Sequence, residues 1–178
     1  MWYVMRTLTG REQELADMID HILKKQGYRS CFVIYQEVVW RADGAFKVCN
    51  KPMFPSYVFV DTDRPDEFFY LLRRVPRLSR MLGSNGTFWT VKKEEQELLC
   101  KMRAAGLRKK QDPIFLIRRS AVTVDAEGNI LTAEGPLKEF VGQIVKKRLR
   151  KRSVVIEIPF LGEKKRIALG IRVAGEEE

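Results

Sequence analysis

The sequence predicts an α+β domain over residues 1–106 and a small all-β barrel over residues 120–178, joined by a linker at residues 107–119. The first region alternates strand-like and helix-like apolar patterns, whereas the second contains only short apolar runs separated by turns. The linker is polar and basic, and Pro113 interrupts it. The chain has 178 residues, of which 45% are hydrophobic, so each region can form its own core.

The first region is expected to begin with a buried strand over residues 2–7, followed by an amphipathic helix. Thr9 and Glu12 have the spacing of a capping box, in which both side chains bond free amides at a helix start. Gly27 is placed to end this helix. Its apolar side chains recur at helical spacing: Leu15, Met18, Ile19, Ile22 and Leu23.

A hairpin, a central strand and a second helix follow. Residues 31–51 are rich in β-branched and aromatic residues and contain Asp43-Gly44, which favours a tight hairpin turn. Residues 57–60 form a short apolar run typical of a central strand. Pro65 is tolerated in the first turn of a helix, so a helix is expected from there until Pro76 stops it.

A brief strand at residues 88–90 and a third helix at residues 92–105 complete an α+β domain with a mixed or antiparallel sheet and three helices. The remaining apolar runs predict five short strands, which indicate a small barrel. These strands are expected at residues 122–124, 130–132, 141–145, 154–159 and 167–171.

The charge favours a polyanionic partner. Lys and Arg number 33 against 23 Asp and Glu, which gives a net charge of +10. An excess of this size favours nucleic acid or an acidic membrane face over a neutral partner, although a basic protein without such a partner is the alternative. No run approaches membrane-spanning length, and we expect no membrane contact. The three cysteines have no CxxC spacing, so a reducing cytoplasm is expected.

No pattern in the sequence indicates catalysis. His21 is the only histidine and lies inside the first predicted helix, and Cys100 has no histidine nearby in the sequence. No glycine-rich phosphate loop and no metal-ligand spacing are present. We therefore expect no enzyme activity, catalytic residue, metal or cofactor.

Two basic clusters stand out in the second region. Six of the seven residues in 146–152 are basic, and residues 164–166 form a second cluster across a turn. We expect the two clusters to meet on one rim of the barrel and to bind RNA, although a charge run is also common on a solvated face. No aromatic residue interleaves with the first cluster, so recognition of phosphates and shape is favoured over base stacking. The residues are Lys146, Lys147, Arg148, Arg150, Lys151, Arg152, Lys164, Lys165 and Arg166.

The first region contains a candidate docking site beside the Trp2-Tyr3 strand. Phe54 and Tyr57 lie around a proline turn, and such turns tend to reach the surface. Core packing is the alternative, but an exposed Phe54 would be an anchor for a partner helix. A second basic patch follows the second helix, for which solvation and nucleic-acid contact are equally favoured: Arg73, Arg74, Arg77 and Arg80.

These segments resemble NusG-type transcription elongation factors. The first region is similar to their N-terminal domain in Trp2-Tyr3-Val4, Gly10-Arg11-Glu12, Phe54-Pro55-Ser56-Tyr57-Val58, Val75-Pro76-Arg77 and Leu82-Gly83. The second is similar to their KOW barrel, an SH3-like fold, in Glu134-Gly135-Pro136-Leu137, Phe140-Val141-Gly142 and Phe160-Leu161-Gly162.

The resemblance implies partners and roles. The first domain would bind the clamp helices of RNA polymerase through the aromatic set Trp2, Tyr3, Phe54 and Tyr57. Arg73 and Arg74 would approach the non-template DNA strand. Phe160 and Leu161 match the barrel tip that receives a termination helicase or a ribosomal protein. We expect the chain to act as a monomer.

Departures from the family pattern favour a specialised paralogue. Ser56 replaces the usual glycine, Leu161 replaces a common phenylalanine, and the barrel is unusually basic. These traits are similar to the LoaP group, in which an antiterminator engages an RNA hairpin through its KOW domain. The alternatives are a general NusG-type factor that couples transcription to termination or translation, and a ribosome-associated RNA-binding protein.

Overall fold

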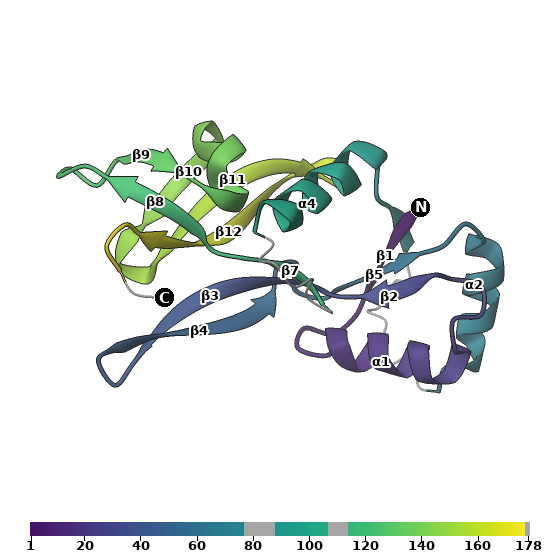
Figure 1. Cartoon of the computed structure of the whole chain (residues 1–178). Coiled ribbons are helices and arrows are strands. Elements are labelled where there is room, and N and C mark those ends of the chain that lie inside the picture. The colour runs from purple at the N-terminus through teal and green to yellow at the C-terminus, as the bar shows by residue number, and fades with distance from the viewer. Residues whose placement is uncertain (77–87, 107–113, 177–178) are drawn as a thin grey trace. The chain divides into compact units, whose positions relative to one another are not determined.

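Figure 1 shows a computed structural model of the chain, in which residues 1–76, 88–106 and 114–176 are described. The chain forms two compact units, one of Met1–Ile34 with Phe54–Gln96 and the other of Tyr35–Met53 with Glu97–Glu178. The predicted class, an α+β region followed by a small β-barrel, is confirmed. Residues 107–113 of the expected linker lie outside the described residues, as do Arg77 and Arg80.

The first unit contains an antiparallel four-stranded sheet in the order β2-β5-β1-β6. Helix α1 (Glu12–Leu23) packs against β2 and β5, and α2 (Pro65–Leu71) continues into the 3-10 helix η1 (Leu72–Arg74) (Figure 1). Side chains from both layers form the core, including Met5, Val58, Val60, Leu15, Ile19 and Leu23. The strands are β1 (Trp2–Arg6), β2 (Ser30–Phe32), β5 (Tyr57–Asp61) and β6 (Phe88–Thr90).

The start of α1 differs from the prediction. Arg11 rather than Thr9 is the N-cap and no side chain bonds as a cap, so the Thr9 half of the capping box is wrong, whereas Glu12 does accept a free amide. The Glu12 carboxylate, which is buried, accepts hydrogen bonds from the amides of Gly10 at 3.1 Å and Ser56 at 2.7 Å. Its second partner lies 44 residues away, and local spacing cannot reveal such a contact. The helix also ends before Gly27, because Lys24 already adopts the left-handed conformation with a φ of 47°.

A long hairpin of β3 (Ile34–Ala42) and β4 (Ala45–Pro52) belongs to the second unit from Tyr35 onward. Asp43 and Gly44 have φ angles of 53° and 79°, which confirms the predicted tight turn. A short strand that the sequence did not predict, β7 (Phe115–Ile117), joins β3 to complete a three-stranded sheet in the order β4-β3-β7. Helix α4 (Lys93–Ala105) agrees closely with its prediction.

The barrel of the second unit has the strand order β10-β11-β12-β8-β9. The strand expected at residues 141–145 begins only at Ile144, because the preceding residues form the 3-10 helix η2 (Gly135–Gln143). The amide of Leu137 anchors η2 by donating to the hydroxyl of Ser120 at 2.8 Å. The strands are β8 (Ser120–Val124), β9 (Ile130–Ala133), β10 (Ile144–Arg148), β11 (Ser153–Phe160) and β12 (Glu163–Val173).

Among the residues that the structure describes, no helix has both the length and the apolar character needed to cross a membrane.

Candidate docking face and nucleic-acid interface

An aromatic face lies on the sheet of the first unit. Strand pairing aligns Phe32, Phe59, Val4 and Trp89 in one row across the sheet. Side chains alternate between the two faces of a strand, so Trp2 and Tyr57 share this face with the row. We name the half-buried members of this surface the aromatic face: Trp2, Phe32, Tyr57 and Trp89.

Ring contacts connect the residues of the aromatic face to one another and to the buried rings of Phe54 and Phe59. Trp2 meets Phe32 edge-on with ring centroids 5.1 Å apart, and Tyr57 lies 6.3 Å from Phe54 with nearly parallel rings. Phe54 is only 2% exposed, so the expectation that it reaches the surface is wrong. The proline turn instead directs Phe54 inward against Phe59, where it supports Tyr57 from below.

Trp2 and Tyr3 lie on opposite faces of the sheet. Because neighbouring residues of a strand point to opposite faces, Tyr3 lies on the face that the helices cover. Its ring contacts Phe69 of α2 edge-on at 5.7 Å. Tyr3 therefore does not join the aromatic face, whereas Phe32 and Trp89, which the sequence reasoning did not single out, belong to it.

A buried carboxylate holds the turn that carries Tyr57. Ser56 adopts a left-handed conformation with a φ of 72°, which is costly for a residue with a side chain. The Glu12 carboxylate accepts the Ser56 amide, and the hydroxyls of Ser56 and Thr9 are 2.6 Å apart. These bonds stabilise the serine in a conformation that favours glycine.

The two basic clusters lie at opposite ends of one ribbon in the barrel. Arg148 pairs with Ser153 at the start of β11, whereas Lys164 pairs with Pro159 near its end. Six residues of extended strand span about 20 Å. The expectation that the clusters meet on one rim is therefore wrong.

Most residues of the second cluster are already engaged. Glu157 accepts a hydrogen bond from Arg166 at 3.2 Å and lies 3.6 Å from the Lys164 ammonium. The hydrogen bond from Arg166 lowers the pKa of Glu157 below its usual range. This carboxylate compensates part of the positive charge at this end of the ribbon.

In the first cluster, two of the six cations have fixed partners. Lys147 donates to the Asn129 side chain at 2.8 Å. Arg152 donates to both carboxylate oxygens of Glu176, at 2.7 and 2.9 Å, which lowers the pKa of that carboxyl. Within the described ranges, no hydrogen bond or ion pair engages the other four. We name them the cationic quartet: Lys146, Arg148, Arg150 and Lys151.

The other predicted site residues have mixed positions. Arg73 and Arg74 are exposed at the end of the second helix; Arg73 lies over the Tyr70 ring at 5.4 Å, and Arg74 donates to Gln26 at 3.2 Å. Phe160 is 1% exposed and belongs to the barrel core, so it does not present a contact surface. Leu161 follows it in a left-handed turn and is half-buried.

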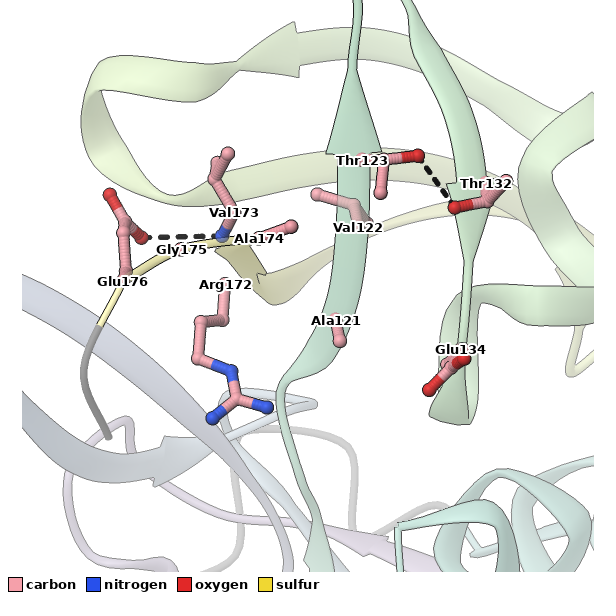
Figure 2. A pocket seen from close by; sticks show the side chains of 10 residues that line it. All are labelled: Ala121, Val122, Thr123, Thr132, Glu134, Arg172, Val173, Ala174, Gly175 and Glu176. Carbon is pink, nitrogen blue, oxygen red and sulfur yellow. Dashed lines mark hydrogen bonds between the residues drawn. The ribbon is translucent and has the colours of Figure 1, made fainter.

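A shallow hollow of about 360 Å³ lies along β8, β9 and the end of β12 (Figure 2). Two of its hydroxyls, on Thr123 and Thr132, pair with each other at 2.6 Å, and Glu176 accepts the Val173 amide at 3.2 Å (Figure 2). Because these polar groups bond one another, they offer little to a bound molecule.

The sequence of the first region carries a family signature. A family model described as "Transcription termination factor nusG" matches residues 1–100. The chain belongs to the NusG family. It is thus a NusG-type transcription termination/antitermination factor, and this family consists of transcription factors.

Individual relatives match most of the chain at low identity. The NusG protein of Halalkalibacterium halodurans is 24% identical over 181 residues, covering 94% of this chain and 93% of its own. That of Vibrio parahaemolyticus is 25% identical over 167 residues, covering 90% of this chain and 87% of its own. A solved structure of Thermotoga maritima NusG is 20% identical with a TM-score of 0.46, covering 95% of this chain and 92% of that one.

Proposed function

We propose that this NusG-type factor is a processive antiterminator that holds RNA polymerase and structured RNA at the same time. Residues 1–106 would form the polymerase-binding domain, residues 107–119 the linker and residues 120–178 the RNA-binding KOW barrel. The proposal assigns the chain to the specialised, LoaP-like members of the family and treats it as a monomer. Holding two sites at once raises the effective affinity at each.

The polymerase contact uses the aromatic face. Tyr57 and Trp89 lie 6.4 Å apart on adjoining parts of this face and are only half-buried, which fits an apolar partner helix such as a clamp helix. Trp2 and Phe32 extend the same face. Phe54 contributes from beneath by supporting Tyr57 rather than by direct contact.

The RNA contact uses the cationic quartet, and this surface carries the proposal most strongly. Four exposed cations without ion-pair partners among the described residues follow one another along β10 and the next turn. Cations that need not break existing bonds are the ones that gain most from phosphate contact. Arg73 and Arg74, which are exposed on the first unit, are proposed to approach non-template DNA.

Retention of RNA polymerase tests the first contact. The full chain is immobilised and exposed to purified core polymerase, and Tyr57→Ala is expected to weaken retention by roughly tenfold or more, as for an aromatic anchor. The matched control is Tyr70→Ala, because Tyr70 is 67% exposed but lies on α2. Equal retention by both variants would contradict the polymerase assignment.

Two binding experiments distinguish the two alternative functions, a general NusG-type factor and a ribosome-associated protein. Leu161 remains half-buried at the barrel tip, where a general factor would receive a helicase or a ribosomal protein. Binding of such a protein to the barrel, lost on Leu161→Asp, would favour the general factor. Binding to ribosomal RNA without any retention of polymerase would favour the ribosome-associated protein.

A further inference from the structure

The hairpin of the second unit exposes apolar side chains near its tip. Trp40 is 55% exposed, Phe46 is 44% exposed and Val48 is 47% exposed. Side chains of this size are normally covered, and several on one short hairpin indicate a contact surface. The hairpin belongs to the same compact unit as the barrel. The barrel residues that it contacts therefore indicate which kind of molecule this surface would bind.

The hairpin is fastened to the barrel by a partly buried ionic contact. Glu37 of β3 accepts from the Arg118 guanidinium at 2.7 Å and from the Arg119 amide at 3.0 Å. A Cβ atom added at Gly170 of β12 would lie 2.3 Å from the Glu37 carbonyl oxygen, so only glycine permits this close approach. These contacts hold β3 close to β12 at Gly170.

The hairpin brings an aromatic ring to the end of the first basic cluster, next to two members of the cationic quartet in the chain. The Arg152 guanidinium lies over the Phe46 ring, 4.8 Å from its centre. Arg41 is the direct cross-strand partner of Phe46, so both side chains project from the same face of the hairpin. Arg150 and Lys151 of the quartet immediately precede Arg152 in the chain.

The fold supplies the aromatic ring that base stacking requires. The basic run contains no aromatic residue, which argued against base stacking. The fold places Phe46, more than a hundred positions earlier, against the end of that run. The two segments that meet at this contact are both basic: residues 34–52 and 144–152 together contain nine Lys and Arg against two Asp and Glu.

We propose that Phe46 stacks an unpaired base of the bound RNA while the cationic quartet holds the adjoining phosphates. Arg152 covers one face of the ring and is itself held by Glu176, so the base takes the remaining exposed part of the ring. The RNA ligand is therefore a stem with an extruded or loop nucleotide beside it, rather than a uniform duplex. This inference rests on the RNA binding proposed above and adds the class of RNA to it.

Two synthetic RNAs test the inference with the full chain. One is a perfectly paired duplex of two strands, and the other is the same duplex with one extruded nucleotide, 2-aminopurine. The wild-type chain is expected to bind the second RNA more tightly and to quench the 2-aminopurine fluorescence, because the base stacks on the ring. Phe46→Leu removes the ring but keeps an apolar side chain, and it is expected to remove this preference, a loss of about fivefold to a hundredfold.

Two control variants test whether the aromatic ring of Phe46 itself causes the preference. Phe46→Tyr should keep the preference, and Val48→Ala, which removes exposed apolar surface from the same face of the hairpin, should also keep it. If wild type and Phe46→Leu bind the two RNAs with the same ratio of affinities, the stacking inference is overturned, while binding of the paired duplex still upholds the quartet. If the wild-type chain binds neither RNA, the RNA assignment and this inference both fail.

Discussion

The salt dependence of RNA binding distinguishes the cationic quartet from the cations that already have partners. The perturbation is Arg148→Gln with Arg150→Gln, which removes two exposed cations that lack ion-pair partners among the described residues. The charge-matched control is Lys164→Gln with Arg166→Gln, since Glu157 already engages both of these cations. Each double variant lowers the net charge equally.

The expected magnitude follows from the number of phosphate contacts. If the four members of the quartet each neutralise one phosphate, log K falls against log salt with a slope of about −3 to −4. Removing two contacts should bring the slope to about −2 and, at about 0.1 M salt, weaken binding roughly fiftyfold. The control pair should leave the slope near its wild-type value.

The assay is fluorescence anisotropy of a labelled RNA stem-loop titrated with the full chain from about 50 mM to about 200 mM salt. An equal loss of slope in both double variants would refute the distinction between free and engaged cations. An unchanged slope in both double variants would show that β10 and the following turn do not bind the RNA.

Three further predictions concern the bonds that shape the two surfaces. Glu12→Gln should lower the free energy of unfolding by about 1–2 kcal/mol in urea denaturation, because a buried charged acceptor of two amides is lost. An unchanged free energy of unfolding would mean that the carboxylate does not stabilise the fold. Ser56→Gly should raise it by about 0.5–1 kcal/mol, since the relief of the left-handed serine outweighs the exposed bond to Thr9; a decrease would show that this bond dominates. The Arg152 contact lowers the folded pKa of Glu176, so its stabilisation is present above the unfolded pKa of about 4.3 and is lost as the pH falls through the lower folded value. Glu176→Gln should flatten this acid limb in pH-dependent unfolding, and a limb identical to wild type would contradict the role of the ion pair.

Local sequence patterns were sufficient where a local interaction decides the structure. Asp43-Gly44 predicted the hairpin turn because its positive φ angles depend on those two residues alone. The apolar spacing of α4 likewise predicted a helix over nearly its observed length. The strand expected at 141–145 was displaced because Pro136 and Leu137 start a 3-10 helix that Ser120 anchors from a distant strand.

The functional surfaces depend on contacts between distant segments, and sequence alone gave only part of them. The burial of Phe54 follows from its packing on Phe59, which no local pattern specifies. The contact of Phe46 with Arg152 joins a hairpin to a barrel and has no signature in either segment.

The separation of the two basic clusters, by contrast, could have been derived from the sequence. A turn at Leu161-Gly162 makes β11 and β12 antiparallel, so residues 164–166 must pair with the end of β11. Residues 146–148 pair with its start. Counting outward from the turn would have placed the clusters at opposite ends.

Readthrough of an intrinsic terminator in a purified transcription reaction tests the bridge between polymerase and RNA most directly. The template encodes either a leader with a bulged stem-loop or an unstructured leader of equal length. The full chain is expected to raise readthrough more on the structured leader, and both Tyr57→Ala and the Arg148→Gln, Arg150→Gln pair should abolish that difference. Readthrough that is the same on both leaders, or that neither variant changes, would contradict the claim that the protein binds RNA polymerase and the transcript at the same time.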